Sequence, residues 1–155
     1  MMTNRRDARF IHLPFRPKND RLPLNVMEQI IPPDIQQFIQ DRIDSIGQLE
    51  ALLLLRESPD TWWEETRLAE RLYIPAKNCR QVTTGLHGAG LFMREETEKG
   101  ERYRYRPANG DLREMVDRLA YYYTHHLVPI SNLVHAKSHS RIREFSRAFK
   151  LGAPD

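Results

Sequence analysis

The stretch "MREETEKGERYRYRP", from Met93 to Pro107, indicates the fold more clearly than any other part of the chain. In its second half arginine alternates with tyrosine, and a period of two residues is typical of a β-strand with two unlike faces. The preceding "LFMREE" also favours a strand, and "TEKG", with Gly100, is typical of a hairpin tip. The stretch therefore predicts a β-hairpin in which Tyr103 and Tyr105 fill the core while the arginines face outward.

The arginine face of this hairpin has two interpretations. It is either a clamp for nucleic acid, formed by Arg102, Arg104 and Arg106, or a solvated surface. Cross-strand Arg–Glu pairs are an ordinary way to stabilise an exposed sheet face, each worth up to about 1 kcal/mol. The acids that partly cancel the arginines are Glu95, Glu96, Glu98 and Glu101. DNA contact through this strand therefore depends on what surrounds it.

Two helices are predicted between residues 33 and 57. Asp34 follows Pro33 and is placed to cap the first N–H groups of "DIQQFIQDRI". Ser45, followed three residues later by Gln48, is a capping box that leads into "LEALLLLRE". The density of leucine in that segment predicts a helix at the centre of the core.

Two further helices are predicted before the hairpin. Trp62 and Trp63 suit a short strand or large side chains that fill the core. A helix is expected over residues 64–73, where acidic residues at its start suit the helix dipole. Pro75 forces a turn, after which "AKNCRQVTTGLHGAGLF" predicts another helix. Gly90 is well placed to cap the C-terminus of that helix.

The order over residues 45–107 is helix, short β piece, helix, turn, helix and hairpin. This order resembles the winged helix-turn-helix domains of MarR-like and PadR-like bacterial transcriptional regulators. The residues that carry the resemblance are "LEALLLLRE", "TRLAERLYIP", "AKNCRQVTTGLHGAGLF" and "MREETEKGERYRYRP". It implies a mainly α fold with a small β-hairpin, that is, a winged helix-turn-helix followed by a long C-terminal helix. It also implies a DNA-binding transcriptional regulator that acts as a dimer on operator DNA.

The chain divides into four expected parts. Residues 1–32 contain Pro14, Pro17 and Pro23 and show no helical period, which predicts an N-terminal arm that is partly disordered and a candidate contact for a protein partner. Residues 33–110 form the expected winged-helix domain, and residues 111–136 the long C-terminal helix. Residues 137–155 are expected to be a basic helix or tail.

The helix after Pro75 is the one that such domains place in the major groove. If Cys79, Val82 and Leu86 face the core, a rotation of about 100° per residue turns a polar set outward. Lysine and arginine neutralise phosphates, and arginine and glutamine bond to base edges. The DNA-binding residues implied by the resemblance are Lys77, Asn78, Arg80, Gln81 and Thr84, with Arg102, Arg104 and Arg106 in the wing. A solvated helix face is the alternative, and it would suit a protein–protein interaction module without DNA binding.

A long helix is predicted from Asp111, its expected cap, over "GDLREMVDRLAYYYTHHLVPISNLVHA", with a kink near His125 because Pro129 removes a backbone hydrogen bond. Apolar and aromatic residues recur at spacings of four and three, the pattern of a heptad seam. We therefore expect a homodimer, unless the helix folds back onto its own domain. The seam residues are Leu112, Val116, Leu119, Tyr123, His126, Ile130 and Leu133.

Composition excludes several classes of function. The net charge is only +3, although residues 31–65 carry a net charge of −6 and both ends are basic. The single cysteine, Cys79, cannot form an intrachain disulfide and favours a reducing, cytoplasmic setting. It is either a small core residue or, beside Lys77 and Arg80, a redox switch. No apolar run approaches the roughly 18 residues of a membrane span, and no signal peptide is evident.

Catalytic and metal motifs are also missing from the sequence. His135 and His139 lie four residues apart, but no cysteine pair completes a zinc site, so we expect no metal and no cofactor. No nucleophile elbow, Walker motif or dinucleotide-binding motif occurs. The sequence therefore favours a binding protein over an enzyme.

Overall fold

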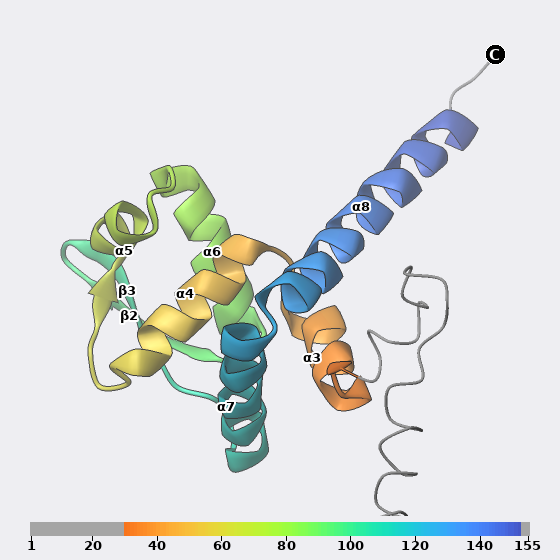
Figure 1. Ribbon diagram of the computed structural model, residues 1–155. Coiled ribbons are helices and arrows are strands. Elements are labelled where there is room, and N and C mark those ends of the chain that lie inside the picture. The colour runs from red at the N-terminus through yellow and green to blue at the C-terminus, as the bar shows by residue number, and fades with distance from the viewer. Residues whose placement is uncertain (1–29, 153–155) are drawn as a thin grey trace, which may run out of the picture.

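The computed structural model describes residues 30–152, with only the backbone of residues 138–142, 145 and 148–152 described. These residues form six α-helices and three β-strands (Figure 1). The elements in chain order are α3 (Pro33–Arg42), α4 (Ile46–Glu57), β1 (Trp63–Glu64), α5 (Glu65–Leu72), α6 (Ala76–Gly88), β2 (Phe92–Thr97), β3 (Gly100–Tyr105), α7 (Gly110–His125) and α8 (Leu127–Gly152). None of the described helices is long and apolar enough to cross a bilayer.

The strands form one antiparallel sheet in the order β1-β3-β2. The predicted hairpin is confirmed, with Phe92 opposite Tyr105 and Thr97 opposite Gly100. The short β piece before α5 adds a third strand, because Trp63 pairs with Tyr103. The protein is thus mainly helical with a small sheet, a winged helix-turn-helix followed by C-terminal helices, and this fold class agrees with the prediction from the sequence.

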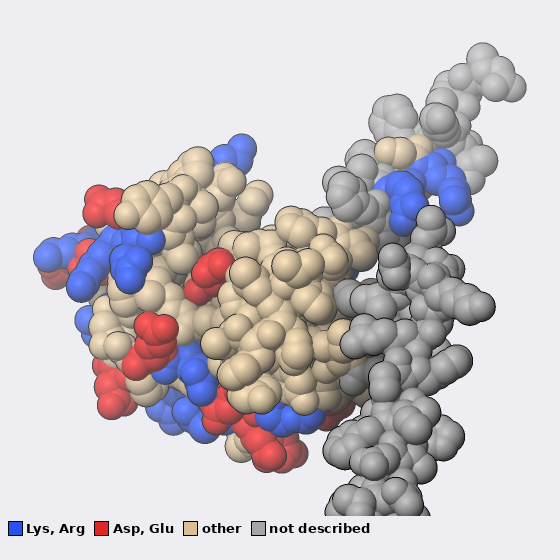
Figure 2. Space-filling model, viewed as in Figure 1, with Lys and Arg blue, Asp and Glu red and all other residues tan. Residues whose placement is uncertain are grey.

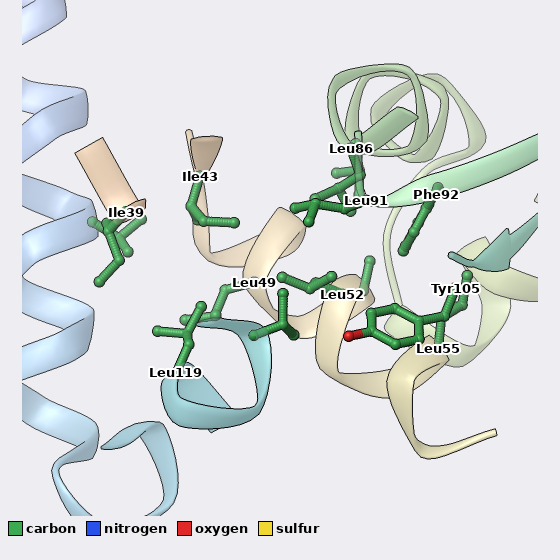
Figure 3. Close-up of a cluster of buried hydrophobic side chains, with 14 of the residues drawn as sticks. Ile39, Ile43, Leu49, Leu52, Leu55, Leu86, Leu91, Phe92, Tyr105 and Leu119 are labelled. Atoms are coloured by element: carbon green, nitrogen blue, oxygen red, sulfur yellow. The ribbon is translucent and has the colours of Figure 1, made fainter. Parts of the chain in front are cut away.

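The core lies where α3, α4, α6, α7 and the inner face of the sheet meet (Figure 3). Its side chains are at most 8% exposed, and burying each aliphatic or aromatic side chain of this size stabilises the fold by about 1.5–3 kcal/mol. The labelled members are Ile39, Ile43, Leu49, Leu52, Leu55, Leu86, Leu91, Phe92, Tyr105 and Leu119. Ile31 is also fully buried, so the end of the segment expected to be an arm belongs to the fold.

Local hydrogen bonds explain where the central helices begin and end. Ser45 Oγ accepts from the N–H of Gln48 at 3.1 Å, which confirms the predicted cap of α4. At the end of α6, Gly90 has φ of 80°, and the N–H of Leu91 donates to the carbonyl of Leu86. This is the Schellman arrangement, in which the left-handed residue lets the chain turn sharply into β2.

Two predicted caps are wrong. The residue before α3 is Pro32, and Asp34 lies inside the first turn, where its carboxylate forms an ion pair with Arg118 of α7. The cap of α7 is Asn109, whose Oδ1 accepts from the N–H of Leu112 at 2.9 Å, and Asp111 lies in the first turn. Asp34 Oδ1 still accepts from the N–H of Ile35 at 2.9 Å, and both acidic residues suit the dipole at the helix start.

The single kinked helix predicted for the C-terminal region is two helices. The chain breaks at His126, with φ of −139° and ψ of 58°, and α8 begins at Leu127. Pro129 lies in the first turn of α8, where a backbone N–H has no intrahelical partner to lose, so it is tolerated near a helix start. The boundary predicted near residue 137 is also absent, because α8 runs unbroken to Gly152.

The predicted heptad seam is used largely inside one chain, so Val116, Leu119 and Ile130 cannot serve a dimer interface, while the dimer contact of the other seam residues stays a prediction. Val116, Leu119 and Ile130 are fully buried in the core of the monomer. Leu112, Tyr123 and Leu133 pack against the same core, and His126 stacks on Tyr122 with the ring centroids 5.9 Å apart. The same spacing serves either a partner helix or the chain's own helices, and here α7 and α8 fold back on α3 and α4.

A buried lysine fixes α8 to the rest of the molecule. The side chain of Lys137 is 3% exposed, and its Nζ donates to the carbonyls of Ile39 at 3.2 Å and Ile43 at 2.9 Å. These carbonyls lie at the C-terminus of α3, where the helix dipole favours a cation. Nζ also lies 2.9 Å from Oδ1 of Asp44, the residue before the cap of α4. One side chain therefore connects α8, α3 and the start of α4.

Close contact between α4 and α6 depends on Gly85. A Cβ at this position would lie 2.2 Å from Nε2 of Gln48. Gln48 cannot easily move away, because it is 5% exposed and its Oε1 accepts from the N–H of Asp44 at 2.7 Å. The glycine that weakens an isolated helix is thus needed for packing here.

We expect Gly85→Ala to destabilise the protein by about 1–3 kcal/mol, because the new methyl group must displace Gln48. The matched control is Gly88→Ala in the same helix, where a Cβ would meet nothing within 4 Å. That change should stabilise the protein by up to about 1 kcal/mol through helix propensity. Urea denaturation measures both, and equal effects of the two variants would contradict the packing role of Gly85.

Candidate nucleic-acid interface

Helix α6 has one buried side and one exposed side. Cys79, Val82, Thr83 and Leu86 are buried, as the predicted phase of the helix requires. The opposite side is exposed along the length of the helix, and it carries two cations, two amides and a hydroxyl. The exposed residues are Lys77, Asn78, Arg80, Gln81 and Thr84. The structure therefore brings together all five α6 residues that the sequence singles out.

A groove runs along this exposed side, between α6 and the start of α4. Its volume is about 760 Å³. Ser45 and Gly47 of α4 form one wall, and Asn78, Gln81 and Thr84 of α6 form the other. The polar row is therefore accessible rather than covered by a neighbouring element.

Arg80 is exposed but already has a partner. Its Nη2 lies 3.3 Å from Oε1 of Glu65, and its side chain is 70% exposed. The hydrogen bond and charge of Glu65 raise the pKa of Arg80 above its ordinary value. The guanidinium is solvated, but the Glu65 side chain is only 13% exposed, so moving Arg80 to a phosphate would leave a largely buried carboxylate without this partner.

The wing arginines lie on the other face of the sheet. Tyr103 and Tyr105 point into the core, so the alternation of β3 turns Arg102 and Arg104 outward. There Arg102 pairs with Glu95 at 2.5 Å, one of the cross-strand pairs that the sequence predicts. Both guanidiniums lie over the ring of Trp62, at 4.6 and 4.9 Å from its centroid.

The structure does not bring Arg102, Arg104 and Arg106 to the side where α6 is exposed. Helix α6 packs against the inner face of the sheet, where Leu86 and Phe92 share the core (Figure 3). Arg106 is also remote from the tip, because it follows the six-residue strand β3 and thus lies about 20 Å from Gly100. The arginine ladder and α6 thus lie on opposite faces of the sheet, and a clamp that combines them stays a prediction.

Lys99 is a candidate contact that the sequence interpretation missed. It lies at the hairpin tip and lines a small groove with Arg80 and Ala76 of α6. The sequence does place a lysine beside the turn glycine, but only the fold shows that this turn meets the start of α6. Glu64, Glu65 and Glu101 line the same groove, so the tip region is of mixed charge. Figure 2 shows the same mixture of basic and acidic side chains over the end of the molecule that carries α5 and the hairpin.

Cys79 is a core residue. Its side chain is fully buried, and Sγ donates to the carbonyl of Glu65 at 3.5 Å. Burial, with a smaller contribution from the charge of Glu65, raises the pKa of the Cys79 thiol to about 11. The thiolate that a redox switch needs is therefore disfavoured, despite the nearby cations of α6.

The comparisons with known proteins find similarity only among solved structures. No family model and no curated protein matches the chain. It is similar to a MarR family transcriptional regulator from Streptomyces coelicolor, with 17% identity, a TM-score of 0.48, and coverage of 80% of this chain and 85% of that chain. A MarR family protein from Bacillus stearothermophilus has 15% identity and a TM-score of 0.44, covering 96% and 89%. The multiple antibiotic-resistance repressor from Listeria monocytogenes has 18% identity and a TM-score of 0.43, covering 81% and 86%.

We expect the stability of the protein to fall between about pH 9 and pH 11 because of Cys79. The thiol has an ordinary pKa of 9.0 and a folded-state pKa of about 11, so the unfolded state loses its proton first as the pH rises. The stabilisation is complete below pH 9 and declines through this range, by about 1–2 kcal/mol. Urea denaturation at several pH values should show a steeper decline than in Cys79→Ala. Parallel declines would show that the thiol does not titrate in this way.

Proposed function

We propose that the protein is a DNA-binding transcriptional regulator of the winged-helix type, which acts as a dimer on operator DNA. The observation that supports this proposal is the exposed row on α6, from Lys77 to Thr84, on a helix whose other side is anchored in the core. An α-helix fits the major groove of B-DNA, which is about 12 Å wide. A rigid helix that carries donors and acceptors outward can therefore read base edges.

The residues of α6 suit different tasks in such a complex. Lys77, in the first turn, would neutralise a phosphate. Arg80 and Gln81 would reach base edges, because guanidinium and amide groups form paired hydrogen bonds with guanine and adenine. Thr84 is short enough to allow close approach of the helix. Lys99 would contact the backbone beside the groove, since it shares a surface with Arg80.

A dimer needs a surface other than the buried seam. Tyr121, Leu127 and Val128 are 55%, 53% and 63% exposed, and all three lie at the turn from α7 to α8. Figure 2 shows a broad area without charged side chains over this part of the molecule. We assign the contact between two copies to this turn. A two-fold dimer would then present its two α6 helices to half-sites about 34 Å apart.

A protein-interaction module without DNA binding is the second candidate. It is favoured by the ion pairs of Arg80 with Glu65, Arg94 with Glu101 and Arg102 with Glu95. These pairs leave few free cations near the hairpin, and phosphate contacts supply most of the non-specific affinity of a DNA-binding protein. The dependence of duplex binding on salt separates the two functions.

We expect the protein to bind a mixed-sequence duplex at about 50 mM salt, measured by fluorescence anisotropy. Lys77→Gln should weaken binding and lower the slope of log K against log salt by about 1. Gln81→Ala should keep the slope and lose about 1–3 kcal/mol of preference between base pairs. Arg71→Gln is the control, because Arg71 is exposed in the last turn of α5 on the side of α4 and α7. No duplex binding by the wild type would refute the regulator.

The dimer is tested by light scattering at several concentrations. Val128→Asp should convert a dimer to a monomer, because it places a charge in an apolar contact. Tyr73→Asp is the matched control, since Tyr73 is 91% exposed and its positive φ of 58° is tolerated by aspartate. A wild-type protein that stays monomeric at high concentration would eliminate the dimer.

A further inference from the structure

A second basic surface lies at the base of the hairpin. A groove of about 440 Å³ runs between the turn after α4, the end of β3 and the first turn of α7. Three arginines line it: Arg104 and Arg106 from β3 and the residue after it, and Arg113 from α7. Asp60 is the one acid in its lining. Figure 2 shows basic side chains gathered where the chain passes from β3 to α7 in Figure 1, with acidic side chains along the edge below them.

Two of these guanidiniums are held by aromatic rings. Arg104 lies 4.9 Å from the centroid of Trp62, and Arg113 lies 5.5 Å from the centroid of Tyr105. A ring occupies the face of a guanidinium and leaves the N–H donors at its edge available, apart from Nη2 of Arg104, which donates to Sδ of Met93 at 3.5 Å. The arginines are therefore oriented without being neutralised.

Five other arginines of the fold are paired with carboxylates, whereas Arg42, Arg67 and Arg71, like the groove arginines, have no ion pair among the described residues. Arg56, Arg80, Arg94, Arg102 and Arg118 each have a carboxylate within 3.3 Å. In the part of the chain that the structure describes, none of the three groove arginines forms such an ion pair. Their charge is thus available for an external anionic group.

The position of the groove argues against a duplex as its ligand. Arg104 points from the outer face of the sheet, whereas α6 packs on the inner face. Arg106 lies about 20 Å from the hairpin tip, which is the part of the wing that meets α6. DNA held by α6 and the tip would therefore leave the base of the hairpin free.

We propose that this groove binds an acidic segment of a partner protein. Carboxylates form paired, charge-assisted hydrogen bonds with guanidinium edges, and three arginines can hold two or more side chains of one extended segment. Pro59 and Pro107 supply apolar walls for the backbone between those side chains. The N-terminus of α7 adds the positive end of a 16-residue helix. The site does not depend on DNA binding by α6.

A short peptide of alternating Asp and Ser residues tests the proposal at about 50 mM salt, by calorimetry and tryptophan fluorescence. We expect the wild type to bind it, with a change in emission that is lost in Trp62→Phe. The double variant Arg106→Gln/Arg113→Gln should lose about tenfold or more in affinity, since each arginine removed deletes a charge-assisted bond. A peptide with Asn in place of Asp should not bind.

The matched control is Arg71→Gln/Arg143→Gln, which removes two exposed arginines outside the groove. It should keep its affinity for the peptide, and the two double variants should bind duplex DNA equally. An equal loss of affinity for the peptide in the two double variants would refute the site. So would a wild-type protein that does not bind the peptide. A selective loss of duplex binding in the groove variant would make the groove a nucleic-acid contact and overturn the proposal. Failure of all duplex binding would instead count only against the regulator.

Discussion

The missing side chain at Gly85 decides how closely α6 lies against α4, and the rest of the interface depends on that contact. Gln48 fills the space beside Gly85 while its own amide oxygen holds the N–H of Asp44. The contact sets the rotation of α6 about its axis, because only one side of the helix can approach so closely. The polar row of α6 is exposed as a consequence of this rotation. Affinity for any ligand of α6 is therefore coupled to packing on its opposite side.

The sequence predicts what local chemistry determines. The alternation at Tyr103 and Tyr105 predicts a strand, and the spacing of Cys79, Val82 and Leu86 predicts the buried side of α6. The sequence does not reveal what covers an apolar face. Val116, Leu119 and Ile130 have the spacing of a dimer seam, and the same spacing serves a helix that folds back. Gly85 is a similar case. The sequence shows a glycine that weakens an isolated helix, but only the structure shows that Gln48 occupies the space beside it.

The sequence also does not reveal which arginines are paired with carboxylates in the folded protein. Alternation places Arg102 and Arg104 on one face of the hairpin, but only the tertiary structure shows that α6 lies behind the other face. Carboxylates then divide the arginines into neutralised and available ones, and this division follows spatial rather than sequential neighbours. Arg80 pairs with a residue fifteen positions away. Available donors occur both on α6 and at the base of the hairpin, on separate elements of the fold.

The buried Lys137 is the point at which α8 is fixed to α3 and to the start of α4. Beyond this residue α8 continues to Gly152, about 22 Å further along the helix axis, away from the body of the molecule (Figure 1). A tilt of about 10° at this point would move the far end by about 4 Å. The same tilt displaces Nζ by much less, but Nζ is bound to the end of α3 and to Asp44, whose N–H holds Gln48 against Gly85. Lys137 therefore links the projecting part of α8, through Asp44 and Gln48, to the packing of α6 against α4.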